Sequence, residues 1–125
     1  MTTLECPNIV FRAVQRSRDM PPEGILAGAF IRYPKDIDGL SIDVVSPRSC
    51  VSVLNKHFGA ASLHVGRVRT LSLDAIVDQH PHGLITGLPF RDVNPTEAEH
   101  FADSLAEMAR YIAKDDVDSC QNEGH

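Results

Sequence analysis

Hydrophobic residues recur with the period of β-strands over the first two thirds of the chain. Segment 8–14 is rich in β-branched and aromatic residues and contains one charge, Arg12, which is typical of a strand. Segments 25–33 and 39–46 flank an Asp-Gly turn sequence, so we predict that they form a β-hairpin. Strand composition returns in segments 60–68, 71–77 and 84–89. Together these segments predict a sheet of five or six strands.

Two further segments carry the signals of helices. In the first, Ser46 can serve as the N-cap, Pro47 fits the first helical position and Gly59 fits the position after the last turn, which predicts a short helix. The second follows Asn94 as its cap, and we predict one long amphipathic helix from about residue 95 to 114. Its apolar positions recur at spacings of three and four, at Ala98, Phe101, Ala102, Leu105, Met108, Ala109 and Ile112.

The order of these elements predicts an α+β fold. The strands come first and one long helix comes last, without the regular alternation of strand and helix that builds a parallel sheet. A chain of 125 residues is long enough for one hydrophobic core and too short for two ordinary domains. We therefore expect a single domain over residues 1–114 with a mainly antiparallel sheet, followed by a disordered acidic tail over residues 115–125.

Charge and cysteine content limit the classes of function. The chain has 17 acidic and 12 basic residues and a formal net charge of −5, so no overall field attracts it to nucleic acid or to an anionic membrane surface. It contains no apolar run of about 20 residues and begins without the pattern of a secretory signal. Its three cysteines have no short spacing that would indicate a metal site or a disulfide pair. We therefore expect a cytoplasmic protein that binds neither nucleic acid nor membranes.

Arg12 is the first candidate for chemistry, because it is the lone charge of an apolar strand. A buried arginine needs a partner, and Asp36, Asp38 and Asp43 follow in the predicted hairpin. Two interpretations are open. Arg12 either forms a structural ion pair with one of these aspartates or binds an anionic ligand, to which its planar guanidinium group is suited.

His64 is the second candidate. In a strand over residues 60–68 it lies on the face opposite Leu63 and Val65, and Gly66 on its own face would let a ligand approach the sheet. His64 either takes a hydrogen-bonding role in the fold or faces a ligand, and we expect it to face the site. Arg67 would then point to the other side of the same strand.

A turn sequence brings Asp78, His80 and His82 close together, and such a set could in principle hold zinc. Histidines in turns are usually solvated, and no cysteine or further histidine lies near in the sequence. We therefore predict no metal. The chain also has no phosphate-binding glycine loop and no nucleophile motif of the kind found in hydrolases.

The segments VFRAV, GAFIRYPKDIDGLSID, ASLHVGRV and HGLITGLP, in this order, resemble a group of small bacterial proteins without an established activity. The first-strand arginine and the later Asp-Gly-Leu-Ser sequence are also remotely similar to RES-type domains, which have ADP-ribosyltransferase-like folds and act on NAD. That resemblance implies a NAD-type pocket in which Arg12 is the first-strand arginine and Ser41 the serine of a later strand. The chain has no match for the family's glutamate, since Glu23 lies in a predicted loop and the next glutamate is Glu97.

The sequence therefore predicts a small cytosolic bacterial protein that binds a small anionic ligand or a protein partner. The expected ligand-binding residues are Arg12, Ser41 and His64. The alternative function is an ADP-ribosyltransferase-like enzyme or toxin-type domain that consumes NAD, and NAD is a cofactor only under this alternative. The sequence predicts neither the oligomeric state nor a catalytic residue.

Overall fold

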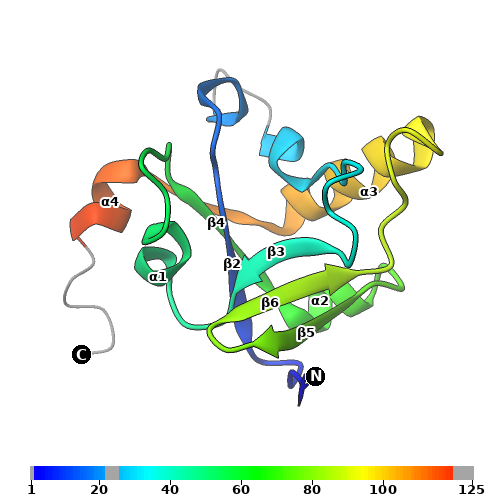
Figure 1. The fold of residues 1–125 in the computed structure, drawn as a ribbon, viewed down its shortest axis with the longest axis horizontal. Helices are drawn as coiled ribbons and strands as arrows, with labels where there is room; N and C mark the ends of the chain where they lie inside the picture. The colour runs from blue at the N-terminus through cyan, green and yellow to red at the C-terminus, as the bar shows by residue number, and fades with distance from the viewer. Residues whose placement is uncertain (1, 22–25, 120–125) are drawn as a thin grey trace.

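An antiparallel sheet forms the centre of the protein (Figure 1). The structure is a computed structural model and describes residues 2–21 and 26–119. The strands are β1 (Thr2–Thr3), β2 (Ile9–Ala13), β3 (Leu40–Asp43), β4 (Ala60–His64), β5 (Asp74–Gln79), β6 (His82–Thr86) and β7 (Arg110–Ile112). They lie side by side in the order β1-β5-β6-β3-β2-β4-β7, and every neighbouring pair is antiparallel. The predicted α+β class and antiparallel sheet are confirmed, with six strands from β2 to β7 and the two-residue β1 at one edge.

The helices lie around the sheet in two groups. They are the 3-10 helices η1 (Ser17–Asp19) and η2 (Leu26–Phe30) and the α-helices α1 (Pro47–Val51), α2 (Val65–Arg69), α3 (Pro95–Met108) and α4 (Lys114–Ser119). Helix α3 packs against η2 at one end of the molecule, and α1 contacts α4 at the other end (Figure 1). None of the helices in the described part of the chain has both the length and the apolar character needed to cross a membrane.

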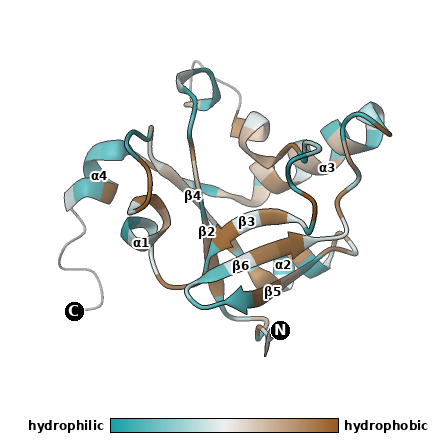
Figure 2. Ribbon diagram, viewed as in Figure 1, coloured by the Kyte–Doolittle hydropathy of each residue, from teal (hydrophilic) through white to brown (hydrophobic). Residues whose placement is uncertain are grey.

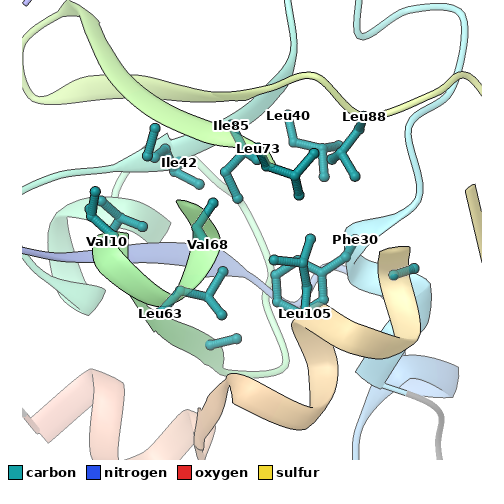
Figure 3. Packing of buried hydrophobic residues seen from close by; sticks show 14 of the residues in the cluster. Val10, Phe30, Leu40, Ile42, Leu63, Val68, Leu73, Ile85, Leu88 and Leu105 are labelled. Atoms are coloured by element: carbon teal, nitrogen blue, oxygen red, sulfur yellow. The ribbon is translucent and has the colours of Figure 1, made fainter. Parts of the chain in front are cut away.

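The main core lies between one face of the sheet and the helices η2, α2 and α3. Val10, Ile42, Leu63 and Ile85 project from four strands, and Figure 3 shows their side chains converging with those of the helices. Figure 2 shows the matching concentration of hydrophobic residues along β3 and β6, whereas α4 is mostly hydrophilic.

A second, smaller core lies under α1 and α4. It contains Ala13 and Ala60 from the sheet, Val51 from α1 and Val117 from α4. Successive residues of a strand point to opposite faces, so Val10 and Ala13 on β2 belong to different cores. Strand β2 is therefore covered on both faces near its end, and it carries Arg12 there.

The predicted hairpin of segments 25–33 and 39–46 is wrong in its first strand. Residues 26–30 form the 3-10 helix η2, and β3 pairs instead with β2 and β6. The physical reason lies in the small side chains of η2. Ala27 and Ala29 let this segment approach α3 closely, with Phe30 fully buried beside it.

The predicted strand 60–68 ends early, at His64. Residues 65–69 form α2, which buries Val65 and Val68 on one helical face. The backbone N–H of Gly66 donates to the carbonyl oxygen of Cys6 at 2.9 Å, which holds the first turn of this helix against the N-terminal segment. Arg67 is on a helix and not on the strand of His64, so the predicted opposition of the two along one strand is wrong.

The two predicted helices begin where expected and end earlier. Ser46 caps α1 and Asn94 caps α3, each accepting a hydrogen bond from the backbone N–H three residues later. Helix α1 ends at Val51. Residues 58 and 59, predicted at the end of this helix, instead extend the backbone pairing beside β2, where Phe58 N–H donates to Val14 O and Val14 N–H donates to Gly59 O.

The C-terminal region also departs from the prediction of a helix to residue 114 and a disordered tail. Helix α3 ends at Met108, and residues 110–112 form β7, which covers the open edge of β4. Residues 114–119 of the predicted tail form α4, and Val117 is fully buried beneath it. The remaining tail residues, 120–125, lie outside the described residues.

Candidate functional site

Arg12 connects three separate segments of the chain. Its side chain leaves β2 on the face of Val10, where its Nε–H donates to the carbonyl oxygen of Ala29 in η2. Its Nη1–H donates to the carbonyl oxygen of Ser41 in β3 at 2.7 Å. The guanidinium group therefore ties η2 and β3 to β2 through two neutral acceptors.

The predicted ion pair of Arg12 with Asp36, Asp38 or Asp43 is wrong. No ion pair involves Arg12 among the residues that the structure describes. The aspartates serve the backbone near them instead. Asp36 accepts a hydrogen bond from the Tyr33 N–H at 2.9 Å.

Asp43 is buried and fully engaged by the turn that follows β3. Its carboxylate accepts hydrogen bonds from the N–H groups of Val45 and Ser46 at 2.8 and 3.1 Å and from the Ser49 hydroxyl at 2.6 Å. These bonds position the start of α1. They also remove Asp43 as a partner for Arg12.

Arg12 consequently has no ion-pair partner among residues 2–21 and 26–119. Burial lowers the pKa of Arg12, and the more distant carboxylate of Asp36 opposes this effect. A guanidinium group stays charged in proteins even so, because its ordinary pKa is far above neutrality. The site therefore contains a partly desolvated positive charge.

A cavity of about 400 Å³ lies beside Arg12, between β2, β3, α1 and the β5–β6 turn. We call it the Arg12 cavity. Its polar lining includes Gln15, Ser41, Asp43, Ser49 and His82, and its apolar lining includes Ala13, Ile42, Leu54 and Pro81. The cavity combines one cation, several hydrogen-bonding groups and an apolar wall, as small-molecule sites do.

Cys50 also lines the Arg12 cavity but is chemically inert there. Burial and the neighbouring charge of Asp43 raise the pKa of Cys50 to about 12. Since the thiolate is the nucleophilic form, a thiol with this pKa does not attack a substrate at neutral pH.

His82 enters the cavity from the β5–β6 turn. Its Nδ1 lies 2.6 Å from the Asp78 carboxylate, which orients the imidazole ring. These two residues and His80 are the set considered above for zinc, for which the sequence predicts no metal. Within the described ranges, no three His, Cys, Asp or Glu side chains are grouped as metal ligands.

The structure brings two of the three predicted site residues together. Arg12 and Ser41 share the Arg12 cavity and a direct hydrogen bond. His64 lies elsewhere, because it pairs with Ile9 at the end of β2 opposite to Arg12. His64 is exposed and does not line the Arg12 cavity.

Sequence reasoning missed Gln15, Ser49 and His82 as lining residues. Ser49 could have been predicted from the sequence, since a serine in the first turn of a capped helix lies near the strand that precedes it. His82 gave no such signal, because the pairing of β6 with β3 brings it next to β3 and depends on the whole sheet.

Comparison with protein-family models finds no family that matches this chain, and the comparisons with curated proteins and with solved structures find no match. The function of the protein is therefore inferred from the geometry of the site itself.

Proposed function

We propose that the protein binds a small organic anion, a carboxylate or a phosphate monoester, in the Arg12 cavity. The observation that carries the proposal is the half-buried side chain of Arg12, whose guanidinium group is partly desolvated and has no ion-pair partner in the described part of the chain. A buried charge is costly when it is unpaired. A bound anion would supply the missing charge.

The geometry of the guanidinium group leaves room for that anion. Nε and Nη1 already donate to Ala29 O and Ser41 O, and Nη2 donates to no acceptor among the described residues. An arginine held rigidly by two carbonyl groups loses little side-chain entropy when a third nitrogen binds a ligand. Gln15 and Ser41 line the cavity near it and can add neutral hydrogen bonds.

The rest of the cavity favours an organic body on the ligand. Ala13, Leu54 and Pro81 provide an apolar wall, and about 400 Å³ lies within the range of small-molecule pockets. An aromatic carboxylate or an aromatic phosphate monoester combines the two required parts. Inorganic phosphate would use the charge alone.

The NAD-consuming alternative needs a carboxylate free to steady a developing cation or to act as a base. Asp43 is the carboxylate lining this cavity, and it already accepts three hydrogen bonds. The geometry therefore favours anion binding over this chemistry.

Calorimetric titration tests the proposal with four probes, which are benzoate, phenyl phosphate, inorganic phosphate and NAD. We expect benzoate or phenyl phosphate to bind and inorganic phosphate to bind more weakly. The diagnostic variant is Gln15→Glu, which adds a negative charge to the cavity wall and leaves the carbonyl contacts of Arg12 in place. It should weaken binding about tenfold or more, the loss expected when one charge-assisted hydrogen bond is replaced by repulsion.

Arg67→Gln is the matched control, because Arg67 is an exposed arginine on α2 outside the cavity. It should bind the probes as the wild type does. If no probe binds the wild type, or if Gln15→Glu binds as tightly as Arg67→Gln, the proposal is wrong. Binding of NAD alone, with cleavage of the nicotinamide bond, would support the enzymatic alternative.

A further inference from the structure

A second cavity, of about 600 Å³, lies between η1, η2 and α3. Six charged side chains line it, and we call it the Asp19 cavity. They are Arg16, Arg18, Asp19, Arg91, Glu99 and Asp103. Opposite charges this close to one another usually pair, so the arrangement of these groups is informative.

These charged groups are not paired with one another. Four ion pairs join described residues, and none of them contains any of the six side chains. Arg16 instead contacts an aromatic ring, with its Cζ 5.4 Å from the centre of the Tyr33 ring. Positive and negative groups therefore face the same space and remain available to a ligand.

Asp19 is the most informative of the six because it is buried. Its residue surface is only 6% exposed, and its side chain borders the cavity. Burial raises the pKa of Asp19, and the nearby charges of Arg16 and Arg18 oppose this. A carboxylate that borders a cavity in this state is a binding group for a ligand with a cationic N–H donor.

The surrounding residues define the rest of the ligand. Arg18 and Arg91 are exposed, so they lie at the outer part of the cavity and can hold a carboxylate. Ala27, Ile31 and Ala102 provide the apolar part of the lining. A molecule that fits has an ammonium group, a carboxylate group and an apolar side chain.

We infer that the Asp19 cavity binds an α-amino acid with an apolar side chain, with its ammonium group on Asp19 and its carboxylate on Arg91. Arg16 and Arg18 are the arginines whose charges act on Asp19 itself, which leaves Arg91 for the carboxylate. This inference concerns a different cavity from the anion site and does not depend on the proposed function. Asp19 and Arg91 do not line the Arg12 cavity, and a smaller cavity of about 80 Å³ lies between the two cavities and is lined by both Arg12 and Asp19.

The test uses the full chain and calorimetric titration with L-leucine, L-isoleucine, L-methionine and L-phenylalanine. For the amino acid that binds most tightly, the N-acetyl derivative lacks the ammonium charge and the amide derivative lacks the carboxylate. Each derivative should bind about tenfold more weakly or worse, the factor expected for one lost charge-assisted hydrogen bond. If none of the four amino acids binds at millimolar concentration, or if either derivative binds as tightly as its parent, the inference is overturned.

Two variants locate the binding site. Asp19→Asn keeps the size of the side chain and removes its charge, and Arg91→Gln changes an exposed residue with little effect on folding. Both should raise the Kd of the amino acid about tenfold, whereas Arg67→Gln should leave it unchanged. If Asp19→Asn does not fold, Arg91→Gln decides the question. Unchanged affinity in the folded variants would overturn the assignment.

Discussion

His57 Nε2 lies 2.8 Å from Asp118 Oδ1, and this contact joins residues 61 positions apart in the chain. The imidazole of His57 is buried, with its Nδ1 accepting a hydrogen bond from the Gly59 N–H at 3.0 Å. Because Nδ1 accepts, Nε2 carries the proton and donates to Asp118. The histidine thus links the segment before β4 to the C-terminal helix α4.

Val117 provides the apolar part of the same attachment, since it is fully buried in the smaller core beneath α4. Val117→Ala should lower the free energy of unfolding by about 1 to 3 kcal/mol, because two buried methyl groups are lost and a cavity is left. Denaturation in urea measures this change. The exposed neighbour Asp115→Ala is the control, and a loss below about 0.5 kcal/mol in Val117→Ala would show that α4 is not docked.

The pH dependence of stability should reveal the contact between His57 and Asp118. The hydrogen bond from His57 lowers the pKa of Asp118, and a second bond from Lys114 adds to this effect. The folded-state pKa lies below the unfolded value, so the ionised carboxylate stabilises the fold above about pH 4 and this contribution is lost as the pH falls through the folded-state pKa.

Asp118→Asn should therefore be less stable than the wild type at neutral pH and should approach wild-type stability in acid. The measurement is the free energy of unfolding of both proteins across the acid range. A constant difference between the two at all pH values would contradict the prediction, because it would show that the carboxylate charge has no role.

The start of each predicted helix could be read from the sequence because capping is a local interaction. Ser46 accepts from the Ser49 N–H at 3.0 Å, and Asn94 accepts from the Glu97 N–H at 3.2 Å. Both partners lie within three residues, so the short sequence window contains the complete interaction. The same holds for β2, whose composition alone identifies a buried strand.

The end of α3 could not be predicted in this way. Ile112 continues the apolar spacing of the helix, yet it pairs with Ala60 as part of β7. The open edge of β4 offers backbone partners that outweigh helix propensity, and that edge exists only after the sheet has formed. The strand predicted in segment 25–33 is wrong for a similar reason, because this segment packs against α3, which is far away in the sequence.

In the candidate site too, some features can be predicted from the local sequence and others depend on the assembled fold. Arg12 stands out in the sequence as the lone charge of an apolar strand, and the structure places it at a cavity. Its acceptors are the backbone carbonyls of Ala29 and Ser41, which have no side-chain signature. The prediction that His64 faces the site is wrong, because it assumed a strand that continues past residue 64. It also depended on the register between strands, which cannot be read from the sequence.

Leu105 tests the position of α3 in the main core. It is fully buried, and Figure 3 shows it beside Phe30 of η2. Leu105→Ala should reduce the free energy of unfolding by about 2 to 5 kcal/mol, the usual cost of emptying a leucine site in a core. Chemical denaturation provides the measurement, with the exposed Glu107→Ala on the same helix as the control. If the two variants are equally stable, Leu105 is not in the core and a different face of α3 packs against the sheet.

Gly28 tests how closely η2 packs on Asp19. A Cβ atom at residue 28 would lie 2.1 Å from Asp19 Oδ1, so the carboxylate would have to move. Replacing glycine by alanine in a helical segment normally stabilises a protein by up to about 1 kcal/mol. Gly28→Ala should instead destabilise this protein by about 1 to 3 kcal/mol, the range for overpacking a buried site.

A double variant separates this steric contact from any general sensitivity of η2. Asp19→Ala removes the carboxylate that the new methyl group would meet, so Gly28→Ala should cost little or nothing in that background. Unfolding free energies of the wild type, the two single variants and the double variant complete the cycle, and we expect a coupling of about 1 kcal/mol or more between residues in direct contact. If the cost of Gly28→Ala is the same with and without the Asp19 carboxylate, the two side chains do not share this space and the wall of the Asp19 cavity is built differently.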